Sequence, residues 1–245
     1  MRRIGVLGLV LGLGGCMPVG LPPVDPVAAP VAVAIPGGGA QGPDLSPEQA
    51  ARNFVDVIVR VEPVAEAICR ARAVGQNCDF QIVVDDRPGS PPNAFQTVDA
   101  QGRPVVGFTV ALIAGAYNAD ELAFVLGHEA AHHIAGHLPR KAQKAQAGAL
   151  LGAVLASVTG ADAQATIQLQ DIAATVSAQS YSKDFELEAD VLGTEIAWRA
   201  GYDPVLGAAF FDRLPDPGDQ FLGSHPPNAR RRAVVAQALA ALQAQ

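Results

Sequence analysis

Apolar residues recur at intervals of three and four in the first part of the chain that shows a regular pattern. This stretch begins at Ser46, followed by Pro47 and by Gln49, the residue types that form a capping box at the start of a helix. The apolar positions that follow are Phe54, Ile58, Val61 and Ala65. Their spacing predicts a helix, in which Pro63 is a candidate bend.

The hydrophobic pattern then changes from helical spacing to short runs of branched apolar residues. Residues 79–86 and 103–113 are such runs, and they predict two strands. A shorter strand is expected at about 94–98, after a loop that is rich in proline. The chain therefore combines a small sheet with helices.

Helical patterns dominate the rest of the chain. Asn118 with Glu121 three residues later predicts a second capping box and a helix that runs to about His137. Residues 141–180 have a helical pattern rich in alanine and glutamine, and their apolar run 148–158 is too short to cross a membrane. We expect that run to form a buried or lid-like helix, with membrane contact as the alternative. Further helices are expected at about 183–200, 204–214 and 227–244, which makes the predicted fold class α+β and mainly helical.

Composition narrows the class of protein. The chain has 245 residues, of which 49% are hydrophobic and 17% charged, enough apolar material for one ordinary domain with a tail. Its formal net charge is −7 and only 5% of its residues are aromatic. Nucleic-acid binding is therefore not expected, because such proteins carry basic surfaces.

The N-terminus has the pattern of a secretory signal. A basic start is followed by a short apolar run and by "LGGC", which resembles a bacterial lipobox, so residues 1–15 are predicted to be a signal peptide and Cys16 to be lipidated. An uncleaved membrane segment and a plain secretory signal are the alternatives. Met17, which is not an aspartate, favours the outer membrane by resemblance to sorted lipoproteins. Residues 16–43 are rich in proline and glycine and predict a tether, which leaves 44–245 as the folded domain.

Two cysteines remain, Cys69 and Cys78. Thiols tend to oxidise outside the cytoplasm, so a disulfide that closes a short loop is expected. Two unpaired buried cysteines are the alternative.

Four of the five histidines lie in "LGHEAAHHIAGH", residues 126–137. His128 and His132 are four residues apart, so both imidazoles face the same side of a helix and can reach one metal ion. With Glu129 they form the HExxH pattern of zinc hydrolases, in which the glutamate moves the proton of a metal-activated water. The alternative is a polar helix face. His133 and His137 are expected to lie on other faces, because their spacing from His132 does not match one helix side.

A zinc site needs a third protein ligand, which must come from another element. The best source is "YSKDFELEADVLG", residues 181–193, where Glu186 and Asp190 lie on one helix face. Glu186 is the predicted third ligand, and Asp190 can accept the N–H of a ligand histidine. Gly193 would let another helix approach closely. The alternative is a solvated acidic helix start.

Together these segments resemble the HtpX-like gluzincin metallopeptidases, whose relatives include CAAX prenyl endopeptidases and periplasmic peptidase lipoproteins. The resemblance rests, in order, on "PPNAF" (91–95), the histidine helix (119–137), the ExxxD helix (181–193) and "SHPPNARR" (224–231). It implies a zincin-type domain in which His128, His132 and Glu186 bind Zn²⁺. It also implies Glu129 as the general acid/base and Asp190 as a partner of a ligand histidine.

The same resemblance implies that His225 and Arg231 lie near the cleft, as catalytic or zinc-capping groups. For His225 the alternative is that "HPP" merely begins the last helix, at Pro227. In gluzincins an edge strand pairs with the substrate backbone, and residues 105–113 are the candidate here, with a plain core strand as the alternative.

The sequence therefore predicts a zinc-dependent endopeptidase of the lipid-tethered, periplasmic branch, at the periplasmic face of the outer membrane. Its expected partners are the membrane, through the lipid anchor, and misfolded or misassembled envelope proteins as substrates. The rival hypothesis is a non-proteolytic or latent zinc-binding lipoprotein that acts as an outer-membrane assembly factor.

Overall fold

A computed structural model describes residues 45–180, 182–216 and 225–244. The predicted signal peptide, the lipidation site Cys16 and the tether lie outside the described residues. Within the described part of the chain, no helix is both long and apolar enough to cross a membrane.

The first helix, α1 (Pro47–Arg72), begins with the predicted capping box. The Gln49 N–H donates to the Ser46 hydroxyl, and the Ser46 N–H donates to the Gln49 side chain at 2.8 Å. Pro63 lies inside the helix, which continues past it to Arg72. A disulfide joins Cys69 near the end of α1 to Cys78, with the two Cα atoms 5.7 Å apart, so it holds the start of the sheet against this helix.

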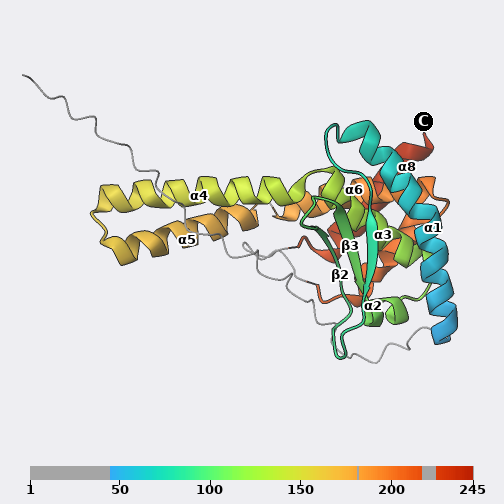
Figure 1. Ribbon diagram of the computed structural model, residues 1–245. Helices are drawn as coiled ribbons and strands as arrows, with labels where there is room; N and C mark the ends of the chain where they lie inside the picture. Colours follow the sequence, from blue (N-terminus) through green and yellow to red (C-terminus); the bar gives the residue numbers. More distant parts are fainter. Residues whose placement is uncertain (1–44, 181, 217–224, 245) are drawn as a thin grey trace, which may run out of the picture. The chain divides into compact units, whose positions relative to one another are not determined.

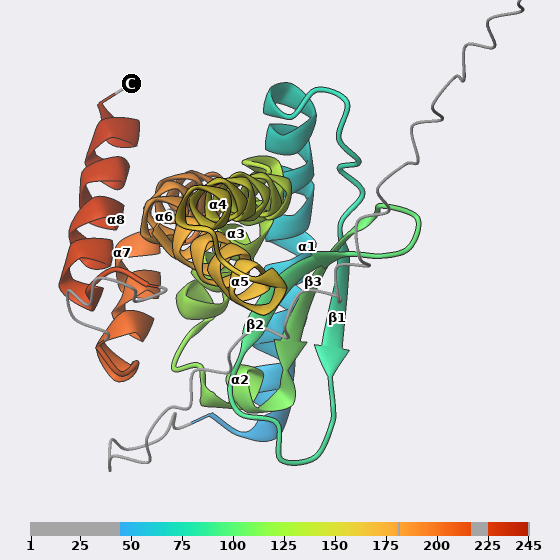
Figure 2. The ribbon, with the colours of Figure 1, turned by 90° about the vertical axis from the view of Figure 1, so that its left-hand side faces the viewer.

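Three strands form one sheet in the order β1-β3-β2. The strands are β1 (Gln81–Asp85), β2 (Ala94–Val98) and β3 (Pro104–Thr109), with β1 parallel and β2 antiparallel to β3. Figure 2 shows the sheet in front of α1, and Phe108 of β3 packs edge-on against Phe54 of α1, their ring centroids 5.0 Å apart.

Two sequence expectations about the segment 103–113 are wrong. The strand ends at Thr109, whose hydroxyl accepts the Leu112 N–H at 3.2 Å and caps a short helix, α2 (Val110–Gly115). The strand is also central in the sheet, so it offers no open edge to a substrate. The buried residues of β3 form part of the hydrophobic core. The edge strand that packs near the histidine helix is β2.

The helical core is built on α3 (Ala119–Ile134), which carries the HExxH pattern and packs between α1 and α6 (Ser182–Arg199). As predicted, Asn118 caps α3, its side chain accepting the Glu121 N–H at 2.9 Å. The chain then closes with α7 (Pro204–Gly207), the 3-10 helix η1 (Ala208–Arg213) and α8 (Asn228–Gln243), which packs on α6. The fold is therefore α+β and mainly helical, as the sequence predicts.

Between α3 and α6 the chain forms a helical hairpin of α4 (His137–Thr159) and α5 (Ala163–Ser180). Figure 1 shows these two helices side by side, extending away from the sheet. Of the expected buried or lid-like helix at 148–158, burial is wrong, because all of its large apolar side chains are exposed. The hairpin core is instead lined by small residues on α4: Gly148, Gly152 and Ala156.

Candidate metal centre

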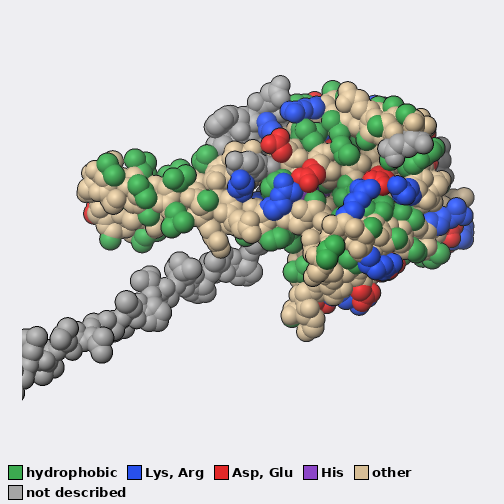
Figure 3. Space-filling view, turned by 90° about the horizontal axis from the view of Figure 1, so that it is seen from above, with side chains coloured by type: hydrophobic (Ala, Val, Ile, Leu, Met, Phe, Trp, Pro, Cys, Tyr) green, Lys and Arg blue, Asp and Glu red, His purple; other side chains and the backbone are tan. Residues whose placement is uncertain are grey.

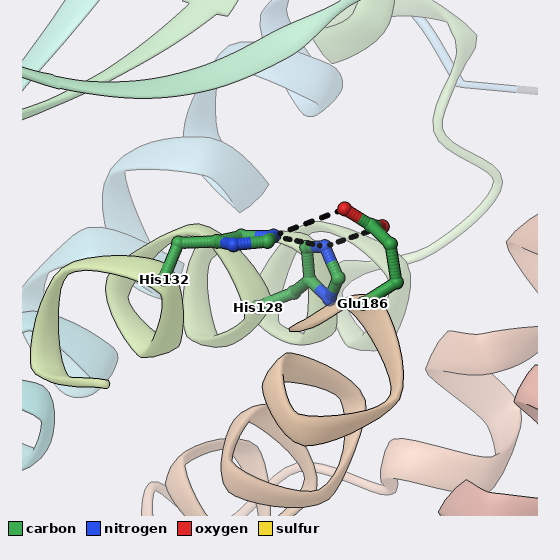
Figure 4. Close-up of side chains that lie close together, drawn as sticks. All are labelled: His128, His132 and Glu186. Carbon is green, nitrogen blue, oxygen red and sulfur yellow. Dashed lines mark hydrogen bonds and ion pairs between the residues drawn. The ribbon is translucent and has the colours of Figure 1, made fainter. Parts of the chain in front are cut away.

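The imidazoles of His128 and His132 and the carboxylate of Glu186 converge on one point (Figure 4). The two Nε2 atoms are 3.1 Å apart, and each lies 3.5 Å from one of the two carboxylate oxygens of Glu186. All three side chains are largely shielded from water. The sequence predicts these three residues as the ligands, and the structure brings the carboxylate of Glu186 on α6 to the two histidines on α3.

These distances fit a metal ion. Zinc bonds to imidazole nitrogen and carboxylate oxygen are about 2.0–2.2 Å, so neighbouring ligand atoms of a tetrahedral site are about 3.3–3.5 Å apart. The separation of the two Nε2 atoms, 3.1 Å, and the distance of 3.5 Å from each of them to a different oxygen of Glu186 are close to these values. Two neutral imidazoles and one carboxylate would leave the fourth corner open, as in catalytic sites.

A pair of glycines brings the ligand helices together. A Cβ atom on Gly193 of α6 would lie 2.8 Å from the backbone nitrogen of His128. A Cβ atom on Gly127 of α3 would lie 2.8 Å from the Gly193 carbonyl oxygen. Since real side chains do not tolerate such contacts, only glycine lets the two helices cross closely enough for Glu186 to reach the histidines.

His128 is held from behind by Asp190 and Arg231. Its Nδ1 lies 3.0 Å from Asp190 Oδ1, so the ring donates this N–H to the carboxylate and turns Nε2 toward the metal position. Arg231 donates to both oxygens of Asp190, at 2.7 and 2.8 Å, and stacks over Phe211. Arg231 is buried, and its Nη2 also lies 3.5 Å from Glu186 Oε2 and 3.5 Å from His128 Nε2, so it fixes Asp190 and lies beside the metal position, near the cleft as the resemblance implies.

His132 has a partner of its own that the sequence analysis missed. Its Nδ1 lies 2.8 Å from Nδ1 of His137, and Nε2 of His137 lies 3.2 Å from Glu188, which also accepts from Arg140. The expectation that His137 lies on another helix face is wrong, because α3 ends at Ile134 and α4 begins at His137.

Two residues signal that break in the sequence. Gly136 adopts a left-handed conformation with φ 65°, which glycine accepts most readily. Pro139 follows in the first turn of α4, the place in a helix where proline is tolerated. A helix boundary at Gly136 could therefore have been predicted, and with it a new direction for His137.

His133 has a structural role, as expected from its spacing. Its Nε2 lies 2.7 Å from the carbonyl oxygen of Asn77, and its ring packs edge-on against Phe80. It therefore points away from the metal position and holds the segment after α1.

The charges of the pocket favour a cation. Burial alone would lower the pKa of His128, but hydrogen bonds to Asp190 and Glu186 raise it to about 9. The pKa of Glu186 is well below its ordinary value despite burial, because His128 and His225 lie beside its carboxylate. Burial lowers the pKa of His132 to about 3, so this ring is neutral and its Nε2 is free to coordinate.

Glu129 has the properties of a proton shuttle. It is half-buried on α3, one residue after His128. Burial raises its pKa to about 7, an effect that the charge of His128 opposes and the charge of Glu186 reinforces. A carboxyl group with this pKa can both take and return a proton near neutral pH.

His225 lies at the same centre. Its Nδ1 is 3.1 Å from Glu186 Oε2 but has no hydrogen bond of acceptable geometry, and it is the one buried side-chain nitrogen among the described residues in that condition. A buried nitrogen left without a partner beside three metal-type donors fits a site that holds an ion. The segment "HPP" also begins the last helix, since Pro227 is the cap residue of α8. Ser224 and Tyr181, at the edges of the matching segments, lie outside the described residues.

The fold and this centre define a class: an α+β domain with an HExxH helix and a third carboxylate ligand from a second helix, as in metal-dependent peptidases. A model of peptidase family M48 matches residues 56–239, and the chain belongs to this family. It is 33% identical over 162 residues to the mitochondrial metalloendopeptidase OMA1 of Saccharomyces cerevisiae, covering 62% of this chain and 45% of the yeast protein. The Arabidopsis thaliana protein of the same name is 31% identical over 126 residues, covering 48% of this chain and 24% of that protein. The matches thus span less than half the length of either relative.

Proposed function

We propose that the chain is a zinc-dependent endopeptidase that hydrolyses peptide bonds in polypeptides at the cell envelope. The observation that carries this proposal is the cluster of metal-type donor atoms on His128, His132 and Glu186, beside Glu129, in a member of a peptidase family. We propose zinc as the metal because two imidazoles and one carboxylate are a common ligand set of catalytic zinc sites.

Zinc bound there would supply a Lewis acid that polarises the scissile carbonyl and lowers the pKa of water. His128, His132 and Glu186 would hold the ion, while Asp190 accepts the Nδ1–H of His128 and His137 accepts the Nδ1–H of His132, which keeps both rings in orientation. Glu129 takes a proton from the attacking water and gives it to the leaving amine nitrogen, so the amide bond breaks as the new carbon–oxygen bond forms.

The substrate backbone would lie along β2 (Ala94–Val98). This strand pairs with β3 on one side only among the described residues, and it packs near α3. An extended peptide added to the edge of a sheet is held by backbone hydrogen bonds that do not depend on side chains. Such pairing favours unfolded or misassembled polypeptides as substrates.

The proposed location is the periplasmic face of the outer membrane of a bacterium. It rests on the signal-like residues 1–15 and on Cys16, the predicted lipid anchor, followed by the tether. Misfolded or misassembled envelope proteins are the substrates that such a location would supply. A latent zinc lipoprotein that assists outer-membrane assembly is the second candidate, because His225 lies 3.1 Å from Glu186 and could close the open metal position.

Cleavage of casein by the purified wild-type protein and by Glu129→Gln decides between the two. The endopeptidase proposal expects cleavage by the wild type and a loss of about 100-fold or more in Glu129→Gln, with zinc still bound, since the glutamine cannot accept a proton. A wild type that holds zinc and cleaves no polypeptide, but binds envelope proteins, would overturn the endopeptidase proposal and support the latent one.

A further inference from the structure

The α4–α5 hairpin is packed through small residues. A Cβ atom on Gly148 would lie 2.7 Å from the Ser177 Cβ, and one on Gly152 would lie 2.7 Å from the Gln170 Cα. Ala156 continues the same row at the next turn and is buried. Helix pairs that meet through a row of small residues four apart are typical of an apolar environment, where large side chains gain nothing by hiding inside.

The large aliphatic residues of this hairpin point outward. On α4 they share one face, with spacings of one, four, five and eight residues, and they are Leu150, Leu151, Val154, Leu155 and Val158. On α5, Ile167 and Ile172 are also exposed. Figure 3 shows hydrophobic side chains over much of the visible surface of the hairpin. In water this arrangement exposes an apolar face on a helix whose buried side is made of glycine and alanine.

Charge is absent from this apolar face and returns at the root of the hairpin. Residues 145–161 contain no charged side chain, whereas Arg140, Lys141 and Lys144 precede them and Lys183 follows α5. Figure 3 shows basic side chains near the root of the hairpin. Arg140 is bound to Glu188, and Lys141 and Lys144 follow it on α4, while Lys183 and Asp184 lie at the start of α6. When an apolar helix face lies on a bilayer surface, lysine and arginine side chains beside it can reach the phosphate groups.

We propose that the exposed face of α4, Leu150 to Val158, inserts into the apolar layer at the surface of a phospholipid bilayer. A protein partner fits less well, because residues 145–180 contain no aromatic residue, arginine or methionine, the residue types enriched at protein interfaces.

The hairpin lies along the surface and does not enter tip first. Asp162 sits at the tip, where its side chain accepts the Ala165 N–H at 2.8 Å and caps α5, so upright insertion would bury a carboxylate. With α4 parallel to the bilayer, its aliphatic face reaches the boundary of headgroups and acyl chains, about 5–10 Å deep, while Asp162 stays in the headgroup layer.

This docking has a consequence for the metal centre that rests on the proposed peptidase function. Leu150 is 13 residues beyond His137, so about 20 Å of helix separates the inserted face from the metal centre. The hairpin joins α3 to α6, the two helices that carry the ligands. The site would therefore act on polypeptide segments close to the membrane surface.

Site-specific fluorescence tests the insertion in the full chain. In a Cys16→Ser background, Cys69 and Cys78 are bonded to each other, so Val154→Cys supplies a single free thiol for an environment-sensitive dye. Val59→Cys on α1 is the matched control, with 68% of the valine exposed against 59% for Val154. The probes are vesicles of phosphatidylethanolamine and phosphatidylglycerol, with and without a quencher on the acyl chains.

The expected result is a blue shift and acyl-chain quenching of the dye at position 154 and neither at position 59. Replacing Leu150, Val154 and Val158 by serine should lower vesicle partitioning of the hairpin by about 100-fold or more, since each loses a buried aliphatic group. Casein cleavage should be unchanged in this variant, which separates failure of docking from failure of the peptidase proposal.

Two results would overturn the membrane proposal. One is a dye at position 154 that behaves in vesicles as it does in buffer. The other is a dye that becomes shielded in buffer as protein concentration rises, with no further effect of vesicles, since this would make the hairpin a contact between two copies of the chain.

Discussion

The contact between His137 and His132 yields the sharpest test of how the metal ligands are positioned. For His132 to coordinate through Nε2, its Nδ1 must carry the hydrogen, and it donates this hydrogen to Nδ1 of His137 over 2.8 Å. His137 then keeps its own hydrogen on Nε2, facing Glu188 at 3.2 Å. Burial lowers the pKa of His137, which favours this neutral form.

Replacing His137 by phenylalanine or asparagine separates its two contributions. Phenylalanine keeps the stacking on Phe185, whose ring centroid is 4.6 Å from that of His137, but removes the acceptor for His132. Asparagine removes the stack and places an amide oxygen near the position of Nδ1. Loss of such a partner of a ligand histidine weakens metal binding by about 10–100-fold, or about 1.4–2.7 kcal/mol. We therefore expect His137→Phe to show this loss and His137→Asn to show less of it.

Zinc affinity measured by competition with a chromogenic chelator checks the expectation, with His133→Phe as the control. His133 is also buried on α3, but it bonds to Asn77 and not to a ligand. The reasoning is refuted if His137→Phe binds zinc as tightly as the wild type, or if His133→Phe loses as much affinity.

Two further substitutions test the scaffold around the site. Gly193→Ala should lower the free energy of unfolding by about 1–3 kcal/mol, measured by urea denaturation, because its Cβ would meet His128 at 2.8 Å; Gly115→Ala, where a Cβ meets no atom within 4 Å, should not destabilise the chain to that extent. Asp190→Asn should cost about 3 kcal/mol in the same measurement, because it removes the nearer of the two carboxylates that buried Arg231 faces, at 2.7 Å, and leaves only Glu186 at 3.5 Å; an unchanged urea midpoint would show that the ion pair with Asp190 contributes little to stability.

The sequence predicts the parts of the site that depend on local geometry. The i, i+4 spacing of His128 and His132 fixes their common face, and the caps at Ser46 and Asn118 fix where two helices begin. Glu186 lies on a different helix, so its prediction as a ligand required a contact between two distant segments. The acidic pair Glu186 and Asp190 on one helix face, with Gly193 three residues later, indicated that contact.

The rest depends on tertiary packing. Strand order is one case: β3 is a nearly continuous apolar run because it is central, yet a weakly alternating run does not by itself identify an edge or a centre. The helical hairpin is a second case. The apolar residues at 148–158 predict a buried helix, whereas in the structure the small residues of α4 face α5 and the large ones are exposed. The direction of His137 is a different case, since it follows from the local turn at Gly136, which the glycine and Pro139 already indicate in the sequence.

Zinc content of the purified protein tests the central claim most directly. The wild type should hold about one zinc ion per chain, and Glu186→Gln should retain much less and cleave no casein. Asp184→Asn, an exposed carboxylate two residues earlier on α6, should match the wild type in both respects. A wild type with almost no zinc under metal-replete conditions, or a Glu186→Gln variant with full zinc and full cleavage, would contradict the assignment of this centre.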